Sequence, residues 1–263
     1  MAVNEPRPGL PAPEADWCLF LDFDGTLVDL REHPRQVTVP VRLANLLQAL
    51  LETFGGAVAI VSGRSLEDLD GLLAPLAMPL AGIHGLERRD AAGRLHRDEG
   101  AERALDAVRA AVGEFVARHD GLFWEDKGAA FAVHFRRAPA LESELRGFLE
   151  AQRERLDEDF HVQAGKSVFE LKPHGRDKGR AVDAFMQEPP FAGRVPVFIG
   201  DDVTDEDAFH TVNAAGGHSI LVAPAGSASA AAWRVDSVED AIGWLEELVE
   251  ILDQDQGTGD QDL

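Results

Sequence analysis

The sequence predicts an α/β fold, in which a doubly wound parallel sheet carries an inserted α+β domain with an antiparallel sheet and two helices. Short, continuous runs of Val, Ile, Leu and Phe alternate with longer stretches whose apolar residues recur with a period near 3.6. This alternation is typical of a parallel sheet that helices cover on both faces. In the middle of the chain the alternation stops and extended stretches follow one another in pairs, which indicates antiparallel strands.

The parallel part is predicted in two segments of the chain. The first reads strand, helix, strand, helix, and Ser65 is placed to cap its second helix. These elements are predicted over 17–23, 40–54, 57–63 and 65–76. The second segment continues with helix, strand, helix, strand and an amphipathic last helix, over 176–188, 195–200, 205–215, 219–223 and 237–252. Together the two segments predict a Rossmann-like core over residues 16–86 and 172–252.

The middle part is predicted as a cap domain over residues 87–171. It opens with a hairpin that has Gly93 at its turn, and helices then alternate with pairs of extended stretches. These elements are the hairpin over 86–98, helices over 101–119 and 139–156, and extended stretches over 122–128, 129–136, 161–166 and 167–173. The Pro-rich residues 1–15 and the polar residues 253–263 are predicted to be disordered tails.

The composition limits the partners of this chain. Its 263 residues include 25 basic and 47 acidic ones, which gives a formal net charge of −22. Such an excess of acid disfavours binding to nucleic acid or to an anionic membrane surface. A phosphorylated substrate would therefore need a metal ion or a local group of cations. The single cysteine, Cys18, lies in an apolar strand and cannot form an internal disulfide. Without a signal-peptide pattern or a membrane-spanning run, the sequence predicts a cytoplasmic protein, with a monomer as the simplest assembly.

Acidic residues follow two of the predicted strands. Asp22 and Asp24 end the first strand, and Asp201, Asp202 and Asp205 follow the strand VPVFIG. In doubly wound sheets, ligands bind outside the carboxyl ends of the strands. Acids gathered there repel one another unless a cation lies among them. Because carboxylate oxygens, water and phosphate are the ligands that Mg²⁺ prefers, the sequence predicts a magnesium site at this edge.

Two further motifs are predicted on the same rim of the sheet. Ser62, Gly63 and Arg64 join a strand to a helix, and Lys178 begins a helix in the last part of the chain. Each motif has a simpler interpretation by itself, as a capped turn, a helix start favoured by the helix dipole, or a solvated lysine. Their joint placement on one rim favours a catalytic site.

The order of these motifs resembles that of a known superfamily. DFDGTL, VSGR, DKG and IGDDVTDED are similar to the motifs of the haloacid-dehalogenase superfamily of phosphatases. GIHGLE, WEDKGAAFAVHFR, GKSVFELKPHGRDKG and GDDVTDEDAF more narrowly resemble trehalose-6-phosphate phosphatases. The resemblance extends from about residue 17 to about residue 250, and so includes the middle part of the chain.

The resemblance implies a role for each residue of the core motifs. Asp22 would be the nucleophile that forms an aspartyl-phosphate, and Asp24 the general acid and then the general base. Thr26 would hold the turn after Asp24. The implied metal ligands, for Mg²⁺, are Asp22, the backbone carbonyl of Asp24 and Asp201. The implied phosphate-binding residues are Ser62, Gly63 and Lys178. Asp202 and Asp205 would orient metal-bound water or Lys178, or one of them would bind the metal directly.

The resemblance also implies sugar contacts from the cap. These contacts would come from Glu125, Arg136, Lys166 and Glu170, with His84 of the core as a further substrate contact. Each of the four cap residues has a simpler interpretation as a member of a surface ion pair, and His84 as a structural histidine. Lys127 and His134 would be their neighbours. Trp124 and Phe131 are interpreted as the core of the cap rather than as platforms for a sugar ring.

Together these features imply a Mg²⁺-dependent phosphatase that hydrolyses trehalose 6-phosphate, a small-molecule sugar phosphate, in trehalose biosynthesis. A phosphatase for another sugar phosphate is the first alternative, because the chemistry lies in the core and the selectivity in the cap. An inactive regulatory module is the second. The presence of Asp22, Asp24, Lys178 and Asp201 disfavours it.

Overall fold

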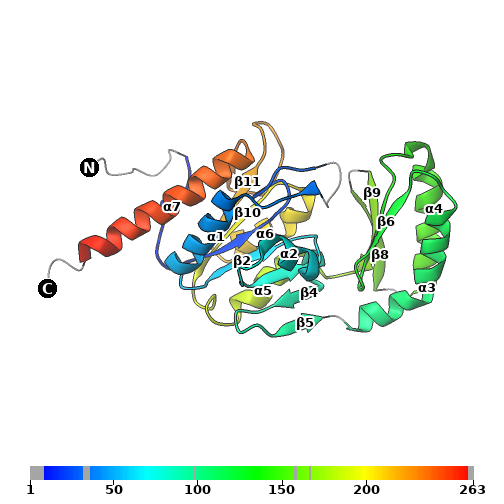
Figure 1. Cartoon of the computed structure of the whole chain (residues 1–263), viewed down its shortest axis with the longest axis horizontal. Helices are drawn as coiled ribbons and strands as arrows, with labels where there is room; N and C mark the ends of the chain where they lie inside the picture. The colour runs from blue at the N-terminus through cyan, green and yellow to red at the C-terminus, as the bar shows by residue number, and fades with distance from the viewer. Residues whose placement is uncertain (1–8, 32–35, 98, 157–158, 166, 260–263) are drawn as a thin grey trace. The chain divides into compact units, whose positions relative to one another are not determined.

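The computed structural model describes residues 9–31, 36–97, 99–156, 159–165 and 167–259 (Figure 1). The chain forms two compact units. The first unit contains the chain up to His96 and from Asp177 onward, and the second contains Arg97–Arg176. Among the described residues, no helix is both long enough and apolar enough to cross a membrane.

The first unit is built on an eight-stranded sheet with the order β12-β11-β10-β1-β2-β3-β4-β5. The strands are β1 Trp17–Leu21, β2 Val58–Val61, β3 Leu80–Gly82, β4 Glu87–Arg89, β5 Leu95–Arg97, β10 Val195–Gly200, β11 His218–Val222 and β12 Trp233–Val235. The strands from β12 to β3 pair in parallel, and β4 pairs antiparallel to β3. The predicted fold class is therefore confirmed.

Helices cover this sheet and bury its central strand. They are α1 Val41–Thr53, α2 Leu66–Leu73, α5 Lys178–Met186, α6 Glu206–Ala214 and α7 Val238–Gly259. Helix α1 packs against α7, beside which it lies in Figure 1, and α5 packs against α6. Every side chain of β1 is buried, and Phe20 of this strand stacks on Phe191 with 5.3 Å between the ring centroids. Burial on both faces is why β1 reads as an uninterrupted apolar run.

The strand order reverses its direction at β1. The chain moves from β1 to β2 and β3 on one side, and from β10 to β11 and β12 on the other. The switch point therefore lies between β1 and β10, and ligands of such sheets bind at this point, outside the carboxyl ends of the strands.

The second unit is a four-stranded antiparallel sheet with helices on one face. The strand order is β6-β7-β9-β8, and the elements are β6 Phe123–Asp126, β7 Phe131–His134, β8 Phe160–Gly165, β9 Val168–Pro173, α3 Glu99–Ala117, α4 Glu142–Arg153 and a 3₁₀ turn, η3, at Pro139–Leu141. Phe131 is buried, and Trp124 meets it edge to face at 5.4 Å and packs against Gly113 of α3. Both rings thus belong to the core of this unit, as predicted.

The hairpin after residue 86 differs from the expectation. It was predicted to open the cap domain, but β4 and β5 extend the sheet of the first unit. Ala81 of β3 pairs with Arg88, whose side chain is buried. A hairpin motif fixes the turn but does not say which sheet the hairpin joins. The second unit accordingly begins at Arg97, not at 87, and ends at Arg176, not at 171.

The two predicted tails also differ from the expectation where the structure describes them. Leu10 packs against the core, and the backbone carbonyl of Ala15 accepts a hydrogen bond from Arg194, so residues 9–15 are not a free tail. Helix α7 continues to Gly259 instead of ending at 252. Extending a helix that has already formed costs little free energy. Polar residues can therefore continue a helix whose apolar face already packs against the core. Residues 1–8 and 260–263 lie outside the described residues.

Candidate active site

The two acidic motifs meet at the switch point of the sheet. Parallel pairing of β1 with β10 places Leu21 opposite Ile199, and the N–H of Asp22 donates to the carbonyl of Ile199 at 2.9 Å. The residues that follow each strand, Asp22 and Asp201, are therefore brought side by side from positions far apart in the sequence.

The carboxylate of Asp22 is buried and has a partner on each oxygen. Its Oδ1 accepts from the ammonium of Lys178 at 2.6 Å, and its Oδ2 accepts from the hydroxyl of Thr26 at 2.9 Å. The same ammonium donates to Asp205 Oδ1 at 2.6 Å. Thr26 was predicted only to hold the turn, so its bond to the nucleophile candidate is a contact that the sequence interpretation missed. The position of Thr26, four residues after Asp22, was the feature of the sequence from which this bond could have been predicted.

Two glycines let the loops approach this closely. A Cβ on Gly25, which has a φ of +88°, would lie 2.1 Å from Asp201 Oδ2. A Cβ on Gly200 would lie 2.3 Å from Asp205 Cγ. Only residues without a side chain leave room for the two carboxylates, which lie close to the backbone at these positions. Both positions therefore require glycine.

Asp205 organises the second acidic loop. Its Oδ2 accepts from the backbone N–H groups of Asp201 and Asp202, both at 3.0 Å, while its Oδ1 holds Lys178. Asp202 is exposed, and its carboxylate accepts from the N–H of Val203 at the start of η4, Val203–Asp205. The structure thus separates these two predicted neighbours of the metal. Asp205 lies inside the cluster, and Asp202 caps a turn at its rim.

The charges of this cluster are not balanced by protein groups alone. Burial, together with the nearby Asp22 and Asp205, raises the pKa of Asp201 to about 8. Burial also raises the pKa of Asp205 to about 7, although Lys178 opposes the shift. Burial alone would lower the pKa of Lys178, but the charges of Asp205 and Asp22 outweigh it and hold the pKa above its ordinary value. Three carboxylates therefore face one ammonium.

This excess of negative charge fits a divalent cation. Asp22, Asp201 and Asp205 each offer an oxygen, and these atoms all lie within 4.8 Å of one another. Carboxylate oxygens are the hard ligands that Mg²⁺ prefers. The donor set therefore suits this ion in chemistry and in charge.

The turn after β2 lies beside a strained segment. Ser62 is buried, and its Oγ accepts from the N–H of Arg64 at 3.2 Å. Ile83 and His84 have φ values of +50° and +53°, which L residues rarely adopt. Their N–H groups donate to the carbonyls of Arg64 at 2.8 Å and Ser62 at 3.0 Å, and these bonds hold the strained turn in place.

Gly63 lies between these two turns. Its missing side chain makes room for the ring of His84, because a Cβ there would lie 2.8 Å from His84 Nε2. The buried His84 is therefore packed directly against the predicted phosphate loop. The structure brings the predicted residues Ser62, Gly63 and His84 together.

Asp24 has a partner that the sequence interpretation missed. The guanidinium of Arg64 donates to both carboxylate oxygens, from Nε to Oδ2 at 2.5 Å and from Nη2 to Oδ1 at 2.7 Å. The VSGR motif contained Arg64, but pairing between loops 40 residues apart leaves no local pattern in the sequence. The N–H of Gly25 donates to the carbonyl of Val28 at 2.7 Å and closes a tight turn just after Asp24.

Two of the predicted sugar contacts, Glu125 and Glu170, lie on one face of the sheet of the second unit. Glu125 of β6 and Glu170 of β9 both stand opposite Ala132 of β7, so the two carboxylates project from the face that α3 and α4 leave uncovered. Oε1 of Glu170 lies 3.2 Å from Nζ of Lys127, and Oε2 of Glu125 lies 3.8 Å from Nε2 of His134.

Gln163 extends the same row. It stands opposite Glu170 on β8, and the sequence interpretation did not single it out. Arg136 is exposed just after β7. Lys166 lies outside the described residues.

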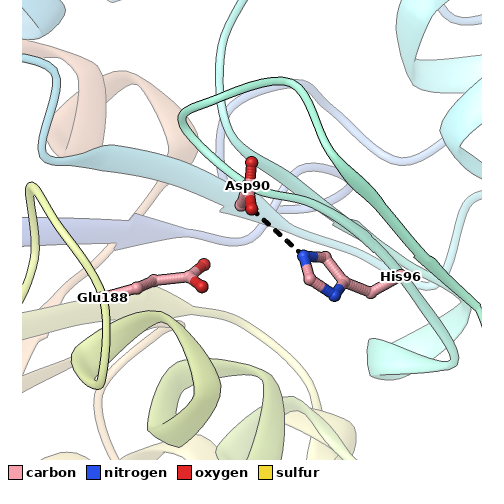
Figure 2. Close-up of side chains that lie close together, drawn as sticks. All are labelled: Asp90, His96 and Glu188. Carbon is pink, nitrogen blue, oxygen red and sulfur yellow. Dashed lines mark hydrogen bonds and ion pairs between the residues drawn. The ribbon is translucent and has the colours of Figure 1, made fainter.

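A second cluster of possible metal ligands lies at the hairpin of the first unit. Figure 2 shows Glu188 pointing toward Asp90 and His96, and oxygens and a ring nitrogen of the three lie within 4.8 Å of one another. Asp90 accepts from the N–H groups of Ala92 and Arg94, from Arg94 Nε at 2.7 Å, and faces His96 Nε2 at 3.1 Å.

Protein groups neutralise this second cluster. Burial alone would raise the pKa of Asp90, but the hydrogen bonds from Arg94 and His96 outweigh it and lower the pKa far below its ordinary value. Glu188 is bound by the guanidinium of Arg88. Because each acid already has a cation beside it, the group fastens the hairpin and, unlike the cluster around Asp22, leaves no charge for a metal to balance.

Cys18 takes no part in either cluster. It is buried in β1, and this burial raises the pKa of its thiol to about 12. A thiol with so high a pKa is not a nucleophile at neutral pH. Its role is packing, as the apolar strand predicted.

Comparison with known proteins agrees with this geometry. The family model of trehalose-phosphatase matches residues 20–239. The trehalose-6-phosphate phosphatase of Escherichia coli (strain K12) is 42% identical over 253 residues, which cover 96% of this chain and 94% of that protein. A protein of Sinorhizobium fredii named "Probable trehalose-phosphate phosphatase" is 46% identical over 225 residues, covering 85% and 84% of the two chains.

A solved structure extends the likeness to three dimensions. The crystal structure of a trehalose-6-phosphate phosphatase related protein superposes with a TM-score of 0.77 at 26% identity, covering 90% of this chain and 99% of that one. The matched residues include both acidic loops, the turn at Ser62 and the lysine at 178. The chain belongs to the trehalose-phosphatase family, within the haloacid-dehalogenase superfamily.

Proposed function

We propose that this chain is a Mg²⁺-dependent phosphatase that hydrolyses trehalose 6-phosphate to trehalose and phosphate through an aspartyl-phosphate on Asp22. The observation that carries the proposal is the buried carboxylate of Asp22, which is held by Lys178 and Thr26 beside Asp201 at the switch point of the sheet. Membership of the family and the relative in Escherichia coli support the substrate, and with it a place in trehalose biosynthesis.

The acidic loops would hold the metal through Asp22, Asp201 and the backbone carbonyl of Asp24. When bound, Mg²⁺ supplies positive charge that neutralises the phosphoryl oxygens, so that an anionic nucleophile can approach an anionic phosphate. Asp205 would support these ligands rather than bind the metal. Its two oxygens already accept hydrogen bonds, one from Lys178 and the other from the backbone of the second loop.

Asp22 makes the new bond. One of its carboxylate oxygens attacks phosphorus as the bond between phosphorus and the sugar oxygen breaks, which yields an aspartyl-phosphate and the free sugar. Lys178 and Thr26 keep the carboxylate in one orientation for this attack, and Lys178 adds a positive charge beside the reacting oxygens. The hydroxyl of Ser62 and the N–H groups of the Ser62 turn bind the other phosphate oxygens.

Asp24 moves the protons. Its carboxyl group gives a proton to the sugar oxygen as that group leaves. It then takes a proton from the water that attacks the phosphorus of the aspartyl-phosphate, which releases phosphate and restores Asp22. A two-step reaction of this kind needs a second acidic residue that lies beside the nucleophile but does not itself bond to phosphorus. Asp24, two residues after Asp22, is this residue.

The second unit would read the sugar. Glu125 and Glu170 accept hydrogen bonds from sugar hydroxyls, whereas Arg136 and Lys166 donate them. Mixed charges suit a polyhydroxyl ligand that carries one phosphate. Lys127 beside Glu170 and the ring of His134 beside Glu125 help to orient these acids before substrate arrives.

The purified protein is expected to release phosphate from trehalose 6-phosphate in the presence of Mg²⁺ and to lose this activity in EDTA. The reason is that three carboxylates face one ammonium, so that without a cation the site repels a phosphate dianion. Phosphate release is measured over a panel of sugar phosphates, with Mg²⁺ restored in excess as the control. Full activity in EDTA would contradict the metal, and a higher kcat/KM for another sugar phosphate would contradict the substrate.

Replacing Glu125 or Arg136 by Ala is expected to reduce discrimination between trehalose 6-phosphate and glucose 6-phosphate. Loss of one charged hydrogen bond to the second sugar ring lowers the ratio of the two kcat/KM values by about tenfold to hundredfold. Glu114→Ala is the matched control, because Glu114 is an exposed acid of α3, on the other side of the same sheet. If the ratio moves no more in Glu125→Ala and Arg136→Ala than in Glu114→Ala, these residues do not read the sugar.

A further inference from the structure

The side chain of Arg64 forms a bidentate ion pair with Asp24 beside the site. Its guanidinium binds both oxygens of Asp24 in a fork, at 2.5 and 2.7 Å. The pair is largely shielded from water, since 10% of the Arg64 side chain and 28% of the Asp24 side chain are exposed. The guanidinium also lies over the ring of Phe23, 5.7 Å from its centroid. Such a bidentate, partly buried pair fixes the orientation of the carboxylate.

This orientation matters because of what Asp24 has to do. A general acid must point an oxygen at the leaving group, within hydrogen-bond reach of the proton's destination. In the structure both oxygens of Asp24 accept from Arg64. When Asp24 carries a proton, the oxygen that bears it is a poorer acceptor, so its bond from the guanidinium weakens while the other bond can remain.

The backbone of Arg64 connects this pair with the phosphate loop. Its N–H donates to the hydroxyl of Ser62 at 3.2 Å, and its carbonyl accepts from the N–H of Ile83 at 2.8 Å. Hydrogen bonds thus hold Arg64 at both its N–H and its carbonyl. A rigid base for the guanidinium limits how far the Asp24 carboxylate can turn.

We infer that Arg64 is the positioning residue for Asp24. It holds the carboxylate through both oxygens in the resting enzyme and through one oxygen during turnover, while the second oxygen exchanges proton with the sugar oxygen and then with water. This inference rests on the proposed function, in which Asp24 is the general acid and base. Arg64 acts through Asp24 and not by binding the phosphate with its side chain.

The leaving group provides the test. Trehalose 6-phosphate expels a sugar alkoxide, which needs a proton, whereas 4-nitrophenyl phosphate expels a stable phenolate, which does not. The comparison is made on the first step alone, in single turnovers with enzyme in excess, because the later hydrolysis of the aspartyl-phosphate needs Asp24 for both substrates. In the presence of Mg²⁺, Arg64→Met is expected to lower the rate of trehalose release from trehalose 6-phosphate by about tenfold to hundredfold, a part of what a general acid contributes. The fall in the rate of 4-nitrophenolate release from 4-nitrophenyl phosphate is expected to be at least about tenfold smaller. Arg64→Lys, which keeps the charge but lacks the fork, is expected to give an intermediate loss.

A double-mutant cycle makes the test specific. If Arg64 acts through Asp24, then adding Arg64→Met to Asp24→Asn produces no further loss of kcat on trehalose 6-phosphate. Equal losses on both substrates, or losses that multiply in the double variant, would overturn the inference and indicate direct binding of phosphate. The activity on 4-nitrophenyl phosphate also reports that the variants are folded.

Failure of the proposed function would look different. The wild-type protein would then be inactive on trehalose 6-phosphate, or Asp24→Asn would slow the single-turnover release of both leaving groups alike. Either result would overturn the inference together with the role of Asp24. Selective loss in Asp24→Asn without selective loss in Arg64→Met would overturn the inference alone.

Discussion

Asp22→Asn is expected to lower the turnover of trehalose 6-phosphate by about a thousandfold or more, because an amide oxygen is far too weak a nucleophile to attack phosphorus. The fold should survive. Asn has the same shape, its amide oxygen can keep the bond from Lys178, and its amide nitrogen can donate to the hydroxyl of Thr26. Phosphate release in the presence of Mg²⁺ measures the loss.

The stability of the same variant separates catalysis from folding. Without metal, three carboxylates face one ammonium, so removal of one negative charge relieves repulsion. In EDTA, the free energy of unfolding of Asp22→Asn is therefore expected to equal or exceed that of the wild type, as measured by urea denaturation. Asp29→Asn is the matched control, since Asp29 is an exposed acid of the same segment, and it should keep full turnover. A variant at position 22 that retains a tenth of the activity would reject Asp22 as the nucleophile.

Lys178→Met is expected to cause a large loss of stability together with loss of turnover. The substitution fills nearly the same volume but leaves Asp22 and Asp205 buried without their common cation. Breaking a buried ion pair by removing one partner costs about 3–5 kcal/mol. Urea denaturation in EDTA measures this loss, and Arg42→Met, which removes an exposed cation, should cost far less.

The pH dependence of that loss follows from the raised pKa values. In the folded protein Asp201 and Asp205 have pKa values of about 8 and about 7, above those of an unfolded chain. The folded state thus takes up protons at a higher pH than the unfolded state, and stability rises as the pH falls through these values. Without Lys178 the folded acids gain more from protonation. The deficit of Lys178→Met should therefore shrink between pH 8 and pH 5. A deficit that stays constant would show that the lost charge is not its cause.

The sequence was sufficient to predict those features that lie at strand ends. In a parallel sheet, pattern alone says which strands are buried, and the residues that follow them must share an edge. Asp22 and Asp201 could be brought together in this way from the sequence. The register of β1 with β10 then places them side by side.

Features that depend on packing between segments could not be predicted in the same way. The hairpin of β4 and β5 carries a clear turn signal, but only the pairing of Ala81 with Arg88 decides which sheet it joins. Strands β3 and β12 have three residues each, too few to show a period. The pair between Arg64 and Asp24 is set by side-chain directions in two loops, and the motif that contains Arg64 says nothing of its partner.

The pairing of Trp17 with Val195 has a consequence for how the protein is made. On the ribosome, β1 emerges among the first strands and must wait for β10, with the whole inserted unit synthesised in between. Until then, one long edge of an apolar strand in the nascent chain has no neighbour, and such edges invite aggregation or chaperone binding. Contacts so distant along the chain also slow folding, since a large loop must close before they form. The two acidic loops that follow β1 and β10 can meet only after this closure.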